Sequence, residues 1–387
     1  MSRFEIKGWC PSALRPMLSG DGLVVRIRPH GGRLSRAQAA GIAEFAGRYG
    51  NGLIDLTGRA NLQIRGVRPE DHDALIKALA QLDLIDADVD SEVQRNILVA
   101  PFWRAGDDTS SIAAELELAL AGRSLGLPAK FGFAVDCGDG RTLAQASADI
   151  RIERGLQDQL IVRPDGMPQG HAVAKADAVG IALALADWFV ASGGVRNGRG
   201  RMAAHIAGGV ELPEALAGRA MPGPAAPPPQ PRLHAGGALV GLAFGQIQGA
   251  TLKFLAGLAP GLRMTPWRMV FLEDAQEMPR HEGLVTQADD PVLRIAACTG
   301  APACPQAHAE TRAFAAALAS SIPAEAQLHV SGCAKGCAYS SPASITLVGA
   351  SDGFDLICDG TAQAVPRLRG LDAATILAKP AVLWGAA

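Results

Sequence analysis

Four cysteines lie close together near the end of this 387-residue sequence. Five residues separate Cys298 from Cys304, and three separate Cys333 from Cys337. Four thiolates can hold either a [4Fe-4S] cluster or a zinc ion. Zinc sites commonly use about two to four intervening residues, so the wider first loop favours the larger cluster. Four buried and chemically inert cysteines are a third interpretation.

Each cysteine pair follows an apolar segment that we expect to be a strand. VLRIAA (residues 292–297) precedes Cys298, and LHVSG (residues 328–332) precedes Cys333. A helix is expected to begin at Cys304 and to run through PQAHAETRAFAAALAS. Gly332 and Gly336 flank Cys333, where a backbone without Cβ atoms can bring its amides close to inorganic sulfide.

The first ninety residues predict a ferredoxin-like unit. An alternating strand over 22–28 precedes Ser35 and Gln38, which form a capping-box pattern at the start of a helix that Gly50 ends. Two strands, over 53–57 and 61–66, and a second helix over 69–84 follow. The order β-α-β-β-α is the core of a ferredoxin-like fold.

Residues 236–273 repeat this order. A glycine-led strand precedes a helix over 248–258, and two strands then surround a turn in which Thr265 corresponds to Thr57. An internal duplication explains the pattern economically. The alternative is that two ordinary α/β units share a common motif.

The remaining segments complete an α+β fold with several domains. Residues 126–163 look like strands, 171–191 like a buried helix, and 221–233 like a proline-rich linker. The predicted divisions are a ferredoxin-like half-domain (1–90), a substrate-binding α/β domain (91–216), a linker (217–235), a second ferredoxin-like half-domain (236–285) and a cluster-binding α/β domain (286–387).

Polar and basic side chains in the first half suggest an anion-binding face. Asn61, Gln63 and Arg65 alternate with apolar residues, so they share one face of a strand. Arg59 lies in the preceding turn, and guanidinium groups bind carboxylates in a bidentate manner. The alternative for any single residue is a solvated polar surface. Arginines also fill the loop around 196–201, as solvated charges or as a further carboxylate clamp.

Composition excludes several classes of protein. A formal net charge of -2 offers no basic field for nucleic acid. The seven cysteines are an odd number, and with no visible signal peptide they argue against a disulfide framework. No apolar run is long enough to cross a bilayer, so we expect a cytoplasmic protein.

The segments around the cysteines, ACTGAPACPQAHAETRAFA and HVSGCAKGCA, resemble the cluster-binding motif of the nitrite/sulfite reductase superfamily. LTGRANLQIRG (56–66), QRNILVAP (94–101) and LPAKF (127–131) resemble other segments of that superfamily. The resemblance implies that Cys298, Cys304, Cys333 and Cys337 hold one [4Fe-4S] cluster. It also implies that Arg59, Arg95 and Lys130 contact an anionic substrate or tetrapyrrole carboxylates.

One segment differs from the reductase pattern and favours another branch of the superfamily. The reductases usually carry Lys-x-Lys in the third segment, whereas Phe131 and Gly132 follow Lys130 here. The opening GWCPSALRPMLSGDGLVVRIRP, together with KFGFAVDCG and MTPWRMVF, is similar to the precorrin-3B synthase branch of the superfamily. That branch implies hydroxylation of precorrin-3A and γ-lactone formation, with dioxygen as oxidant and NADH as electron source, in aerobic cobalamin synthesis.

The same resemblance implies further components. A mononuclear non-haem iron would bind dioxygen, with ligands that the sequence does not reveal, and a separate reductase would deliver electrons. Siroheme is less expected, although Cys337 would be its bridging ligand in a reductase. The alternative functions are a siroheme-dependent sulfite or nitrite reductase and a non-catalytic carrier of a cluster or tetrapyrrole. No catalytic residue is assigned.

Overall fold

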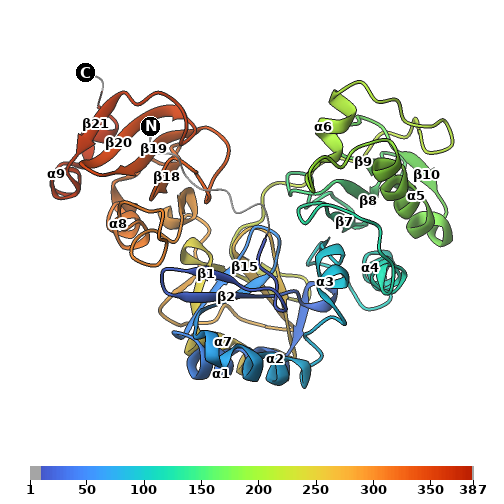
Figure 1. The fold of residues 1–387 in the computed structure, drawn as a ribbon, viewed down its shortest axis with the longest axis horizontal. Helices are drawn as coiled ribbons and strands as arrows, with labels where there is room; N and C mark the ends of the chain where they lie inside the picture. The colour runs from blue at the N-terminus through green and yellow to red at the C-terminus, as the bar shows by residue number, and fades with distance from the viewer. Residues whose placement is uncertain (1–9, 386–387) are drawn as a thin grey trace.

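The computed structural model describes residues 10–385 as three lobes (Figure 1). The central lobe combines segments from both halves of the chain, and its helices lie on the side away from the two outer lobes. One outer lobe is formed mainly by residues 97–216, and the other by residues after 290. No described helix has the length and apolar character needed to span a membrane.

Two sheets form the central lobe. The first has the order β1-β2-β5-β4-β13, with β1 Met17–Ser19, β2 Gly22–Ile27, β5 Leu62–Val67, β4 Leu53–Leu56 and β13 Gln246–Gln248. The second has the order β11-β12-β15-β14-β3, with β11 Arg232–His234, β12 Gly237–Leu242, β15 Met269–Glu273, β14 Gly261–Met264 and β3 Arg33–Ser35, and β16 Leu284–Val285 pairs with β12.

The two half-repeats exchange a strand. β3 belongs to the first half but pairs with β14, placing Leu34 opposite Leu262. In the reciprocal arrangement β13 pairs with β4, placing Ile247 opposite Ile54. The helices α1 Arg36–Tyr49, α2 His72–Ala80 and α7 Gly249–Leu258 follow the repeat order, and one apolar core contains residues of both halves. The predicted pair of ferredoxin-like half-repeats is therefore confirmed, as a single shared core.

Local sequence signals explain where α1 begins and ends. The Ser35 hydroxyl accepts a hydrogen bond from the Gln38 amide at 3.2 Å, and the Gln38 side chain accepts one from the Ser35 amide at 2.9 Å. This reciprocal capping box satisfies two amide groups that the first helical turn leaves unpaired. Gly50 then ends the helix.

The first outer lobe is a mixed sheet with helices. Its strands are β6 Ile97–Val99, β7 Phe133–Asp136, β8 Ile150–Arg154, β9 Leu160–Pro164 and β10 His171–Val173. Its helices are α4 Asp108–Leu120, α5 Ala178–Ala191 and α6 Met202–Ala207, with α3 Val89–Gln94 leading into it. The prediction of one helix over 171–191 is wrong at its start, because His171–Val173 extends the sheet beside β9 before the helix begins.

The second outer lobe carries the cysteine loops. Its strands are β17 Ile295–Ala297, β18 Leu328–Ser331, β19 Ala343–Ala350, β20 Gly353–Gly360 and β21 Leu368–Leu371, with helices α8 Arg312–Ala317 and α9 Ala373–Ala378. β17 and β18 are parallel neighbours, so the loops after both strands leave the same edge of the sheet. Cys298 and Cys333 follow these two strands.

The helix predicted from Cys304 begins later than expected. Residues 304–311 form turns, in which the Cys304 amide donates to the Gly300 carbonyl and the Ala301 amide to the Ala309 carbonyl. These contacts fold the loop back on itself, so α8 starts only at Arg312. Short 3-10 turns complete the fold: η1 His30–Gly32, η2 Pro69–Asp71, η3 Lys175–Asp177, η4 Ala243–Gly245, η5 Pro291–Arg294, η6 Ala319–Ser321 and η7 Pro380–Leu383.

Candidate functional site

A cavity of about 710 Å³ is lined by residues from all three lobes. The central lobe contributes side chains from β1, β2 and β5, including Arg26, Gln63 and Arg65. The first outer lobe contributes residues 128–130 and 198–201, and the second contributes the loops that follow β17 and β18. A cavity of this size can enclose much of a large organic ligand.

All four clustered cysteines line this cavity: Cys298, Cys304, Cys333 and Cys337. None of them is in a disulfide. The Gly332 amide donates a hydrogen bond to Cys298 Sγ at 3.2 Å, the kind of backbone contact that stabilises a thiolate ligand. The wall is therefore built from two loops that present sulfur and backbone amides together.

The thiols also influence one another electrostatically. Burial raises the pKa of the Cys333 thiol, and the nearby Cys304 and Cys298 raise it further. Partial burial likewise raises the pKa of Cys337, with Cys298, Cys333 and Cys304 adding to the rise. Four thiolates gathered in this way need a strong counter-charge, which bound iron would provide.

The four cysteines form no site for a single metal ion among the described residues. Among residues 10–385, no group of three or more His, Cys, Asp or Glu side chains converges on one position that a metal ion could occupy. A structural zinc ion needs such a convergence, whereas the four thiolates of an iron–sulfur cube bind different iron atoms. The same result leaves the expected mononuclear iron without a ligand set in the described part of the chain.

The rest of the cavity wall is strongly basic. Its lining has no Asp or Glu among the described residues, and its cationic members are Arg26, Arg65, Lys130, Arg199, Arg201 and Lys335. A buried cation with no carboxylate partner among residues 10–385, such as Arg26, is costly unless a ligand supplies negative charge. The wall is therefore suited to an anion, and its number of cations suits a polyanion.

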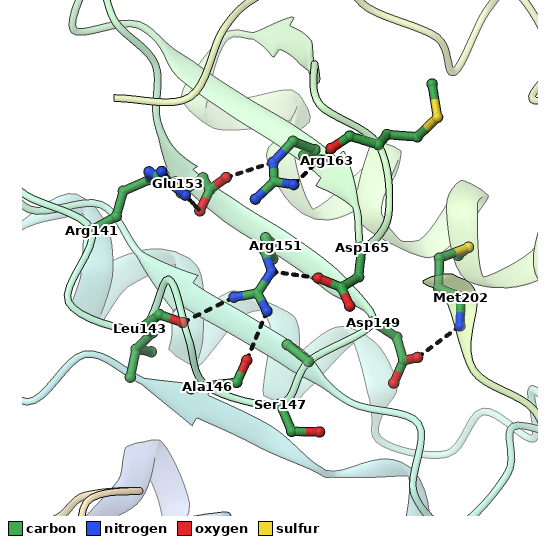
Figure 2. Close-up of polar contacts among 12 residues, drawn as sticks. Arg141, Leu143, Ala146, Ser147, Asp149, Arg151, Glu153, Arg163, Asp165 and Met202 are labelled. Atoms are coloured by element: carbon green, nitrogen blue, oxygen red, sulfur yellow. Dashed lines mark hydrogen bonds and ion pairs between the residues drawn. The ribbon is translucent and has the colours of Figure 1, made fainter. Parts of the chain in front are cut away.

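Two of these cations are held by carboxylates just outside the cavity. Arg65 forms an ion pair of 2.7 Å with Asp21, and Arg201 one of 2.8 Å with Asp149. Asp149 is fully buried and also accepts hydrogen bonds from the Met202 and Gly132 amides. Figure 2 shows Asp149 reaching the Met202 amide, beside the Arg151–Asp165 ion pair. This network positions the loop that carries Arg199 and Arg201.

The other cations are less compensated. Neither Arg26, Lys130 nor Arg199 has an ion-pair partner within residues 10–385. Burial lowers the pKa of Arg26, an effect that the neighbouring Cys10 opposes. The Nε atom of Arg26 is buried without a hydrogen-bond partner in the described part of the chain.

The residues that the sequence singles out for substrate binding fall into two groups. Gln63, Arg65 and Lys130 line the cavity, whereas Arg59, Asn61 and Arg95 do not. Arg59 points to Ser147 of the first outer lobe at 3.4 Å, and the Asn61 Nδ2 atom is buried with no partner among the described residues.

Arg95 instead forms hydrogen bonds with other parts of the chain. Its guanidinium binds Asp86 at 2.7 Å and donates to the Arg28 carbonyl at 2.9 Å. Arg26, on the strand expected over 22–28, does line the cavity. The loop over 196–201, expected to carry solvated charges or a further carboxylate clamp, contributes Arg199 and Arg201 to the same lining.

Gly132, which follows Phe131, has no room for a side chain unless its neighbours move. A Cβ atom at Gly132 would lie 2.6 Å from Asn96 Nδ2 and 2.9 Å from the Asn96 backbone oxygen. The second lysine of the reductase pattern is thus replaced by a residue that packs directly against its neighbour. Lys130 is the remaining cation of that segment, and it faces the cavity.

The sequence is similar to proteins of known family. Residues 15–82 match the nitrite/sulfite reductase ferredoxin-like half domain. The chain is 30% identical to a precorrin-3B synthase of Sinorhizobium sp over 93% of this chain and 84% of that protein. It is 28% identical to the ferredoxin–nitrite reductase of Synechococcus elongatus, over 88% and 79% of the two chains.

The fold has a counterpart among solved structures. The NirA protein of Mycobacterium tuberculosis superposes with a TM-score of 0.62 at 17% identity, over 88% of this chain and 74% of that one. At this identity the likeness concerns the fold alone.

Proposed function

This chain belongs to the precorrin-3B synthase family within the nitrite/sulfite reductase superfamily of oxidoreductases, and from that premise we propose that it converts precorrin-3A to precorrin-3B. The reaction hydroxylates the meso carbon between rings D and A, and the ring A acetate closes as a γ-lactone. One atom of dioxygen enters the product and the other leaves as water. NADH supplies the two electrons.

The observation that carries the proposal is the composition of the cavity wall. Four cysteines line it together with six cations, and no carboxylate is among the described lining residues. Precorrin-3A is a tetrapyrrole with many carboxylates, so a wall of this charge suits it.

The chain's own residues would bind and orient the substrate. Arg26, Lys130 and Arg199 would each meet a substrate carboxylate, because no carboxylate of the described chain pairs with them. Arg65 and Arg201 are fixed by Asp21 and Asp149 and would present preorganised donors. The [4Fe-4S] cluster, held by Cys298, Cys304, Cys333 and Cys337, would supply single electrons when bound.

The source of those electrons is proposed to be a separate reductase that oxidises NADH. The mononuclear iron implied by the family resemblance has no three-ligand group within residues 10–385, and no step is assigned to it. Siroheme is not required by this reaction.

Incubation with precorrin-3A, NADH, a reductase and ¹⁸O-labelled dioxygen tests the proposal. The expected product gains one labelled oxygen atom and carries a lactone, and a parallel reaction in labelled water with ordinary dioxygen gives no label in the hydroxyl group. Recovery of unchanged precorrin-3A from protein that contains its cluster would refute the oxygenase function and leave a carrier role.

A siroheme-dependent reductase is the second candidate, favoured by the similarity to a nitrite reductase and by the exposure of Cys337. The packing of Gly132 against Asn96 argues against it, because the second lysine of the reductase pattern has no room there. An absorption spectrum of the purified protein separates the two candidates, since siroheme has visible bands that an isolated cluster lacks.

A further inference from the structure

Two equivalent turns of the half-repeats contact different outer lobes. The turn after Thr57 has Ala60 at φ 55°, and the turn after Thr265 has Arg268 at φ 61°. From the first turn, Arg59 reaches Ser147 of one outer lobe. From the second, Arg268 reaches the other outer lobe, at the loops that carry the cysteines.

Arg268 occupies a backbone conformation that side chains other than glycine rarely adopt. Such conformations cost free energy and persist where the surroundings impose them, often at functional sites. The corresponding position in the first half is Ala60, so the turn itself does not require an arginine. The reason for Arg268 must therefore lie in its contacts.

Those contacts hold the two cysteine loops. One terminal nitrogen of Arg268 donates to the Ala338 carbonyl at 2.8 Å, next to Cys337. The other donates to the Ile295 carbonyl at 3.4 Å, on the strand that leads to Cys298. Arg268 does not line the cavity among its described lining residues, so it lies where it can act on the cysteine loops and not on the substrate.

The charge of Arg268 has no carboxylate partner within residues 10–385. Burial lowers its pKa, and the nearby Arg312 lowers it further, with no acidic group opposing the effect. Arg312 differs, because it pairs with Asp55 at 2.8 Å. The fully buried His329 is also nearby and is neutral, since burial lowers its pKa to about 4. Arg268 is thus an isolated cation beside the cysteine loops.

We propose that Arg268 is a positioning residue for the iron–sulfur cluster: it fixes the loops of Cys298 and Cys337 and raises the reduction potential of the cluster with its uncompensated charge. The proposal rests on the cluster assigned above. Four thiolates give the cluster a net negative charge that grows by one on reduction, so a nearby cation stabilises the reduced form more.

Anaerobic potentiometric titration followed by EPR tests this role in the full-length protein. Arg268→Met removes the charge and keeps an apolar stem, whereas Arg268→Lys keeps the charge. At the wild-type midpoint, Arg268→Met is expected to lower the ratio of reduced to oxidised cluster about tenfold, which equals a shift of about 59 mV for one electron. Arg268→Lys should stay within about threefold of wild type, or about 30 mV. Arg232→Met, at an exposed position on β11, is the matched control and should not shift.

The outcomes are distinct. An unchanged potential in Arg268→Met with full cluster content overturns the proposal, as do equal shifts in both Arg268 variants, which would assign the effect to a lost hydrogen bond. Loss of the cluster from both variants would show that the hydrogen bonds of Arg268 hold the loops whatever its charge, and would overturn the proposed effect on the potential. Wild-type protein without inorganic sulfide would instead refute the cluster, and with it the proposed function.

Discussion

At the scale of single residues, cluster binding depends on which cysteines face the cavity. Cys333 lies in the wall, whereas Cys358 lies on β20 and is absent from the described lining. Cys333→Ala is therefore expected to remove most of the acid-labile sulfide, because the cluster loses one of its four ligands. Cys358→Ala should keep wild-type sulfide and iron, measured on anaerobically purified protein. Equal sulfide in both variants would remove Cys333 from the ligand set.

The loop over 196–201 offers a matched pair of arginines. Arg199 and Arg196 are both exposed, but only Arg199 is among the cavity-lining residues. Arg199→Ala is expected to weaken precorrin binding about tenfold, since a hydrogen bond to a charged group contributes about 1.5–3 kcal/mol and solvent screening reduces it. Arg196→Ala should change the affinity by less than about twofold. Tryptophan fluorescence titration measures both, and equal losses would contradict a specific carboxylate contact.

Gly132 provides a steric test of the departure from the reductase pattern. Gly132→Ala is expected to destabilise the first outer lobe by about 1–3 kcal/mol, because its Cβ would overlap Asn96. A Cβ at Gly138 meets nothing within 4 Å, so Gly138→Ala is the control. The midpoint of urea unfolding, followed by circular dichroism, reports both. An unchanged midpoint for Gly132→Ala would show that a side chain fits there.

At the scale of elements, the strand exchange ties the two half-repeats together. Leu34 is 0% exposed and its strand β3 pairs with β14 of the other half. Leu34→Ala is expected to lower the free energy of unfolding by about 2–5 kcal/mol, the range for buried leucines. Leu118→Ala, at a side chain that is 77% exposed, should change it by less than about 0.5 kcal/mol. Urea unfolding of the two variants compares them, and similar stabilities would contradict the shared core.

Elements with local signals were predictable, and elements defined by distant partners were not. Ser35 and Gln38 predict the start of α1, because the two side chains that form the capping box lie within one helical turn. His171–Val173 forms a strand only because β9 is available to pair with it. Residues 304–311 contain helix-forming alanines, but the hydrogen bond between Ala301 and Ala309 closes them into turns. The repeat order could be recognised, whereas the exchange of β3 and β13 depends on the assembled halves.

At the scale of the whole molecule, the cavity joins segments that are distant in sequence. Its cationic wall combines Arg26 from the central lobe with Arg199 from one outer lobe, and Lys335 lies beside the cysteines of the other. Spacing within the sequence could indicate that four cysteines act together, because each pair is local. It could not show that Arg95 pairs with Asp86 and lies outside the cavity, because spacing alone does not reveal which side chains meet when the segment between them folds.

The central claim is that Cys298, Cys304, Cys333 and Cys337 hold an iron–sulfur cluster beside a cationic cavity wall that binds a polyanion. Analysis of iron and acid-labile sulfide in anaerobically prepared protein, with EPR after reduction, tests it most directly. We expect about four iron and four sulfide per chain and the EPR signal of a reduced [4Fe-4S] cluster. Protein that holds zinc and no inorganic sulfide would contradict it.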